Sequence, residues 1–122
     1  MLAIKNLTKE PVDRKLLTDV AKIVLKGENI DKEREISLVF VEPLEIQKLN
    51  LKYRNINKAT DVLSFQGQGE CLGEIVICLK EVKNNLAFVF IHGILHLLGY
   101  EHERLEDEQA MQEKTEEYLN KI

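Results

Sequence analysis

All three histidines of this 122-residue chain lie between residues 92 and 102. His92 and His96 are four residues apart, so on a helix their imidazole rings share one face and can bind one metal ion. Gly99 follows, and because glycine tolerates a left-handed backbone it can end the helix and turn the chain. His102 can then supply a third nitrogen ligand. Three protein ligands leave one position of a tetrahedral ion open, as in catalytic zinc sites.

The alternative to a metal site is a set of ordinary core histidines. A lone histidine on an apolar helix usually bonds to a backbone carbonyl, but two imidazoles buried side by side without partners would cost roughly 1–3 kcal/mol each. A metal ion binds one nitrogen of each ring and leaves the other to donate a hydrogen bond. The sequence therefore predicts one divalent ion bound by His92, His96 and His102. Zinc is favoured, while nickel, cobalt and copper also accept nitrogen ligands.

The spacing H-x-x-x-H-x-x-G-x-x-H also occurs in the metzincin proteases, with one difference. Those enzymes carry a glutamate after the first histidine, which acts as the general base for the metal-bound water. Gly93 stands at that position here. The difference argues against peptide hydrolysis. Glu101 and Glu103 are nearby carboxylates, and solvated charges at a helix start explain them equally well.

The elements that position these histidines follow from hydrophobic periodicity and from turn residues. Four strands are expected, at residues 2–7, 35–41, 61–65 and 73–79. Helices are expected from Pro11 to Gly27, from Pro43 onward, from residue 84 or 85 to Leu98, and from residues 103–107 to the end. Pro11 and Pro43 suit first helical turns because their φ angle is fixed. The third helix is apolar almost all round, so the metal-binding helix should be buried.

This order of elements predicts an α+β fold, in which one mixed sheet of about four strands is packed with helices. No linker or internal repeat divides residues 1–122, so we expect a single domain. Ile46, Leu49 and Tyr53 share one face of the second helix, which is followed by a basic stretch. Gly67 and Gly69 predict a turn between the last two strands.

Composition narrows the function further. The formal charge of −4 argues against a protein that coats nucleic acid by bulk charge, although a local basic groove is compatible with it. Cys71 and Cys78 form neither a C-x-x-C unit nor a disulfide framework, and Cys78 is expected to be a buried small hydrophobe. No signal peptide or membrane span is expected, because the longest apolar run is shorter than the 20 or so residues that a span needs. We therefore expect a cytoplasmic protein.

Residues 92–102 (HGILHLLGYEH) resemble the signature of the YbeY family of bacterial endoribonucleases. Two further stretches resemble the family in the same order: residues 49–54 (LNLKYR) with 60–65 (TDVLSF), and residues 72–77 (LGEIVI). The similarity spans about residues 35–119. The family commonly has aspartate where Glu101 stands, and residues 79–86 look shorter than usual.

The resemblance implies a metal site at His92, His96 and His102, and a single-stranded RNA substrate. It further implies a role in 16S ribosomal RNA 3′-end maturation and ribosome quality control, with the small ribosomal subunit and possible ribosome-associated proteins as partners. The family's conserved arginine corresponds to Arg54, whose planar guanidinium is suited to phosphate. Lys48, Lys52 and Lys58 are candidates for lining the RNA path.

Other readings of the same residues stay open at this point. One is a metalloprotease-like hydrolase, and another is a non-catalytic ribosome assembly factor with a structural metal. The sequence does not identify a general base. Ser64 and Thr60 are candidates for binding phosphate or for bonding to the backbone, and Phe65 for stacking a base or for packing in the core. The acidic last helix is expected to face away from RNA.

Overall fold

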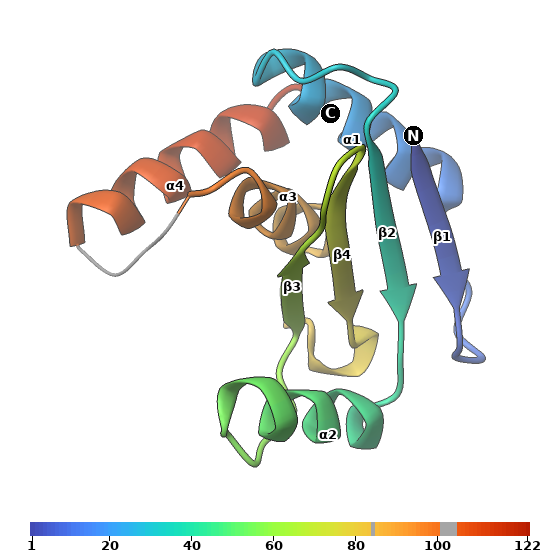
Figure 1. Cartoon of the computed structure of the whole chain (residues 1–122). Coiled ribbons are helices and arrows are strands. Elements are labelled where there is room, and N and C mark those ends of the chain that lie inside the picture. Colours follow the sequence, from blue (N-terminus) through green and yellow to red (C-terminus); the bar gives the residue numbers. More distant parts are fainter. Residues whose placement is uncertain (84, 101–104) are drawn as a thin grey trace.

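One mixed sheet organises the chain in the computed structural model, which describes residues 1–83, 85–100 and 105–122. The strands within this part are β1 (Leu2–Asn6), β2 (Glu35–Phe40), β3 (Val62–Gln66) and β4 (Cys71–Ile77). They lie in the order β1-β2-β4-β3, where β1, β2 and β4 run parallel and β3 runs antiparallel to β4 (Figure 1). The predicted α+β fold with a mixed sheet of about four strands is confirmed.

Helices lie between and after these strands. They are α1 (Arg14–Gly27), α2 (Pro43–Arg54), α3 (Leu86–Leu97) and α4 (Leu105–Leu119), with a short 3-10 helix η1 (Leu79–Glu81) before α3. Pro43 opens α2 as predicted. The prediction that Pro11 opens the first helix is wrong, because Asp13 is the N-cap and its carboxylate accepts a hydrogen bond from the Leu16 amide at 3.0 Å.

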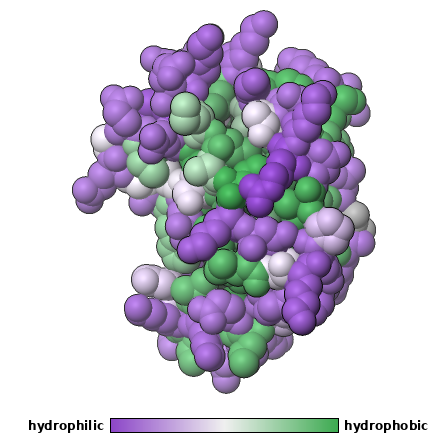
Figure 2. Space-filling view, turned by 90° about the vertical axis from the view of Figure 1, so that its right-hand side faces the viewer, coloured by the Kyte–Doolittle hydropathy of each residue, from purple (hydrophilic) through white to green (hydrophobic). Residues whose placement is uncertain are grey.

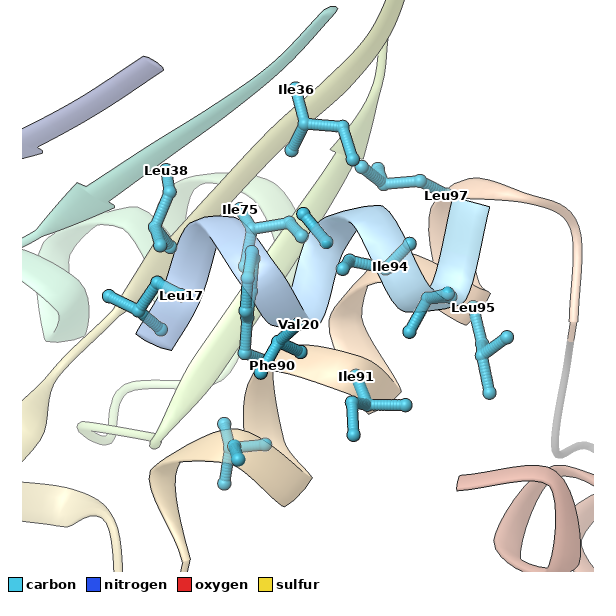
Figure 3. Packing of buried hydrophobic residues seen from close by; sticks show 14 of the residues in the cluster. Leu17, Val20, Ile36, Leu38, Ile75, Phe90, Ile91, Ile94, Leu95 and Leu97 are labelled. Carbon is cyan, nitrogen blue, oxygen red and sulfur yellow. The ribbon is translucent and has the colours of Figure 1, made fainter. Parts of the chain in front are cut away.

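The main core lies between one face of the sheet and the helices α1, α3 and α4. In Figure 3, side chains of α1 (Leu17, Val20) and α3 (Phe90) meet side chains from β2 (Leu38) and β4 (Ile75). All five are at most 1% exposed. Burial on this scale contributes roughly 1.5–3 kcal/mol for each large apolar side chain, so these contacts hold α1 and α3 against the sheet.

A smaller cluster lies near the end of the sheet where α2 packs (Figure 1). It joins Ile46 of α2 to Val76 of β4, and Cys78 is fully buried within it as expected. The predicted apolar face of α2 is confirmed only in part. Ile46 is buried and Leu49 is half-buried, whereas Tyr53 is 56% exposed.

The hairpin between β3 and β4 brings β3 against α3. The turn predicted at Gly67 and Gly69 is present: Gly67 N–H donates to the Leu72 carbonyl at 2.9 Å, and Gly69 has a φ of 62°. Gly73, with a φ of 150°, lies so close to the Phe65 carbonyl that a Cβ atom there would overlap it. Glycine is therefore required for the strands to pair at this point.

The two edge strands of the sheet are β3 and β1, of which β1 lies at the right of Figure 1. Figure 2 shows this side of the molecule, where hydrophilic side chains surround and interrupt the apolar surface. In the described part of the chain, no helix combines the length and the apolar character that crossing a membrane requires.

Candidate functional site

The helix α3 carries two of the predicted ligands and is enclosed along most of its length. Asn85 caps it, and its side-chain oxygen accepts a hydrogen bond from the Ala87 amide at 2.8 Å. Eight of its twelve residues are buried. Phe88, His92 and His96, which follow one another at four-residue spacing, are half-buried and line a cleft. The helix thus presents one strip of rings to the cleft while its other sides form the core.

His92 and His96 lie as the spacing predicts. Their ring centroids are 5.1 Å apart and their planes are inclined by 82°. Two imidazoles on one tetrahedral zinc ion, with Zn–N bonds of about 2.0–2.1 Å, would have ring centroids about 5 Å apart. The pair therefore fits two ligands of one ion. Within the described residues, no other His, Cys, Asp or Glu side chain completes a three-ligand group with them.

His102, the predicted third ligand, lies outside the described residues, as do Glu101 and Glu103. The turn that leads towards His102 is described. Gly99 has a φ of 99°, and the Tyr100 amide donates to the Leu95 carbonyl at 3.0 Å, which closes the end of the helix. The predicted glycine turn after α3 is confirmed, whereas the three-histidine set stays a prediction.

Gly93 has a packing role that the sequence did not reveal. A Cβ atom on it would lie 3.1 Å from Ile75 Cγ2 and 3.4 Å from Ser64 Oγ, so the helix backbone sits directly on the sheet. The Ser64 hydroxyl donates to the Gly93 carbonyl at 3.3 Å. A larger residue at this position would press its Cβ atom on Ile75, whose side chain would have to shift. Glycine at the position of the metzincin general base therefore allows close packing of α3 on the sheet, and Ser64 bonds to the backbone.

The cleft has a volume of about 1150 Å³ and runs between α3, β3 and the end of α2. Arg54 lines it together with His92 and His96, so the structure brings three of the four predicted site residues together. Arg54 is the last residue of α2 and is exposed. Asn55 follows with a φ of 60° and turns the chain towards β3.

The buried amide of Asn50 secures this turn. Its side chain is 2% exposed, and Nδ2 donates to the Lys58 carbonyl at 2.9 Å. The segment that follows Arg54 is therefore held against α2, which fixes where the arginine emerges on the cleft.

Of the basic residues that were expected to contact RNA, only Arg54 lines the cleft. Lys48, Lys52 and Lys58 are not among the described residues that line the cleft, whereas Lys83 is. Of the carboxylates, Asp61 and Glu81 line it, and Thr60 Oγ1 bonds to Asp61 Oδ1 at 3.4 Å. None of the lining residues comes from α4, all of whose residues are described.

Three elements meet at Glu28, just beyond α1. Its carboxylate accepts a hydrogen bond from the Tyr100 hydroxyl at 2.6 Å, accepts another from Tyr118 of α4, and lies 3.6 Å from the Lys114 ammonium. Gly27 makes this approach possible, because a Cβ atom there would overlap the Tyr118 ring. We refer to Glu28, Tyr100 and Tyr118 as the tyrosine clamp. It ties the chain just after α3 to α1 and α4.

The clamp shifts the pKa values of its members. Burial by itself would raise the pKa of Glu28, but the hydrogen bonds from Tyr100 and Tyr118 and the charge of Lys114 outweigh it and lower that pKa below its usual value. Donation to Glu28, with burial, raises the pKa of Tyr100 to about 12. Burial and the same carboxylate raise the pKa of Tyr118 further. The carboxylate is therefore ionised and both hydroxyls are protonated at neutral pH.

Sequence reasoning missed several residues of the site. Tyr53 and Phe88 line the cleft, yet their apolar character suggested core positions. Asp61 lines it as well, just before β3. Glu28 lies 72 residues from Tyr100, so no local pattern could have paired them. The sequence offers one signal for this contact, the glycine and polar residue at a helix end at Gly27-Glu28.

Comparison with known proteins identifies related sequences over almost the whole chain. The family model described as "Endoribonuclease YbeY" matches residues 3–122. A protein of that name from Pelotomaculum thermopropionicum is 39% identical over an alignment of 128 positions, gaps included, that covers 88% of this chain and 84% of the relative. One from Ureaplasma urealyticum is 36% identical, with 98% of this chain and 87% of the relative covered.

A solved structure is also similar. The solution structure of a Thermotoga maritima protein superposes with a TM-score of 0.61 at 32% sequence identity. The similarity covers 98% of this chain and 87% of that protein. The overall arrangement of strands and helices is therefore shared with a solved protein.

Proposed function

We propose a function for the cleft on the basis that this chain belongs to the YbeY family of endoribonucleases. The cleft hydrolyses phosphodiester bonds of single-stranded ribosomal RNA. The observation that carries the proposal is the meeting of His92, His96 and Arg54 on one cleft in a chain of this family. The substrate we propose is 16S ribosomal RNA near its 3′ end, within the small ribosomal subunit. This activity would serve ribosome maturation and quality control.

The cleft residues would divide the work between binding and charge neutralisation. Arg54 would bind a phosphate through two N–H groups, which would stabilise the negative charge that develops on the non-bridging oxygens. His92 and His96, with His102 as the third ligand, would hold one divalent ion, for which we propose zinc. Such an ion, when bound, supplies Lewis-acid activation and a bound water of lowered pKa. Asp61 and Glu81 are the described cleft carboxylates able to accept a proton.

A direct experiment compares substrates. Purified protein is incubated separately with single-stranded ribosomal RNA, with the same RNA in a duplex, and with casein. We expect cleavage of the single-stranded RNA alone. Peptide cleavage that His96→Ala abolishes, without any RNA cleavage, would replace the proposal with a metalloprotease-like activity.

Arg54→Ala separates a nuclease from a binding module. A nuclease should lose mainly turnover, by about 100-fold, because the arginine acts on charge that develops in the transition state. Lys22→Ala is the matched control, because it removes the same charge from an exposed position of α1. If Arg54→Ala weakens RNA affinity and the wild-type protein never cleaves RNA, the chain is an assembly factor without catalysis.

Elemental analysis tests the ion. We expect about one equivalent of zinc per chain and its loss in His92→Ala. A metal content that this substitution leaves unchanged would exclude the proposed ligand set. Phe88→Leu is the control. It removes the ring next to His92 but changes no proposed ligand, so this variant should retain the metal.

A further inference from the structure

Tyr53 is a large aromatic side chain that the fold leaves open at the cleft. It lies on the last turn of α2, directly before Arg54, and is 56% exposed. The sequence predicted that Tyr53 shares one face of the helix with Ile46, but of these two residues only Ile46 is buried. An exposed ring beside a phosphate-binding arginine is a suitable surface for a nucleobase, because every base has a π-face.

The Tyr53 ring packs against a second aromatic ring. The Phe65 ring of β3 meets it edge-to-face, with centroids 5.0 Å apart and planes inclined by 66°. Phe65 is itself half-buried and packs against the smaller apolar cluster. A ring held in this way loses little further conformational entropy when a ligand binds it.

A cation already lies over this ring. The Lys52 ammonium is 5.1 Å from the Tyr53 centroid, although both side chains are exposed. One electron-rich face of the ring is therefore within reach of a cation. An incoming nucleotide could take this place with its base while Lys52 moves to the phosphate.

The other tyrosine and phenylalanine rings of the described cleft lining are less exposed than Tyr53 and make contacts of their own. Phe88 stacks on His92 with centroids 6.1 Å apart, and Tyr100 donates its hydroxyl to Glu28. Phe65, which the sequence offered as a candidate for base stacking, packs edge-to-face against Tyr53. Tyr53 is therefore the ring of this set that is best placed to receive a base.

We infer that Tyr53 is the base-stacking residue of the cleft, on which one unpaired nucleobase stacks while Arg54 binds an adjacent phosphate. This inference rests on the proposed function and adds a residue that selects the substrate. A base within a duplex is stacked on its neighbours and cannot offer its face to the ring, so Tyr53 favours single strands without reading their sequence.

Binding of a short 2′-O-methyl oligoribonucleotide, verified to remain intact, tests the inference by fluorescence anisotropy. Tyr53→Leu should weaken binding by about 5- to 150-fold, the range for loss of one stacked base. Tyr53→Phe keeps the ring and should bind within about twofold of wild type. Leu44→Ala is the matched control, because Leu44 is a 63% exposed apolar residue of the same helix that does not line the cleft.

A scan of abasic positions along the oligonucleotide provides a test that leaves the protein unchanged. At one position, removal of the base should weaken binding by the wild-type protein as much as Tyr53→Leu weakens binding of the intact oligonucleotide. At that position, the Tyr53→Leu protein should bind the abasic oligonucleotide no more weakly than it binds the intact one. Equal affinities of wild type and Tyr53→Leu, or additive losses at every position, would overturn the inference even if the wild-type protein cleaves RNA. A wild-type protein that neither binds nor cleaves RNA would overturn the proposed function and the inference together.

Discussion

Removal of one hydroxyl from the tyrosine clamp should measurably destabilise the whole fold. Tyr118→Phe keeps the ring, which is 1% exposed, and deletes only the hydroxyl that donates to Glu28. No cavity forms, so the change isolates one hydrogen bond to a carboxylate whose side chain is 10% exposed. Tyr100 and Lys114 remain to satisfy the carboxylate in part.

The magnitude follows from the charge of the acceptor. A hydrogen bond to a charged group contributes about 1.5–3 kcal/mol, whereas one between neutral groups contributes about 0.5–1.5 kcal/mol. For a domain of this length, the larger range corresponds to a fall in melting temperature of about 5–15 °C at pH 7. Tyr53→Phe, the same chemical change on a ring that is 56% exposed, is the control and should change stability by less than about 0.5 kcal/mol.

The effect should depend on pH with a defined sign. Because the clamp lowers the pKa of Glu28, its contribution is present above the unfolded-state pKa of about 4.5 and is lost as the pH falls through the folded value. Because the pKa of Tyr100 is raised to about 12, its contribution is complete below pH 10 or so and is lost as the pH rises through about 12. The penalty for Tyr118→Phe should therefore shrink in acid.

Thermal unfolding followed by circular dichroism, between pH 3 and pH 8, measures the penalty. Glu28→Gln provides a second comparison, because an uncharged acceptor should make the penalty for Tyr118→Phe small at every pH. If Tyr118→Phe melts at the wild-type temperature at pH 7, the clamp does not act through the ionised carboxylate. The same conclusion holds if the penalty at pH 7 persists undiminished at pH 3 and in the Glu28→Gln variant.

Other substitutions test the packing around the cleft. Gly93→Ala should cost at most about 2 kcal/mol, because the strain of a methyl group 3.1 Å from Ile75 Cγ2, about 1–3 kcal/mol, is offset by about 1 kcal/mol from the higher helix propensity of alanine; denaturant unfolding measures the net loss. Asn50→Ala should cost about 1–3 kcal/mol by leaving the Lys58 carbonyl without its 2.9 Å donor; unchanged stability would show that this bond contributes nothing. Asn85→Ala should lower stability by about 1 kcal/mol through loss of the α3 N-cap, whereas Asn85→Asp should retain most of it.

Much of the fold was predictable because its signals are local. Alternating or continuous apolar runs predicted all four strands, and Pro43 and Gly99 marked a helix start and a helix end that the structure confirms. The first helix was misplaced because two N-terminal signals lie close together in the sequence. Pro11 suits a helix start, but the Asp13 carboxylate caps the backbone and decides the position.

The site was predictable to the extent that it lies on one helix. The four-residue spacing of His92 and His96 determines that their rings share a face, whatever the rest of the fold does. The role of Arg54 came from a family resemblance, and its place on the same cleft depends on how α2 packs at the end of the sheet.

By itself, the sequence determined the elements and the spacing of the ligand pair, because helical and strand periodicities act between near neighbours. Tertiary structure decided the rest, because contacts between distant segments depend on packing. It left Tyr53 exposed beside the cleft, closed Gly93 against the sheet, and brought Glu28 to Tyr100 and Tyr118 across 72 and 90 residues. Such pairings arise only when the core has set the distances between helices.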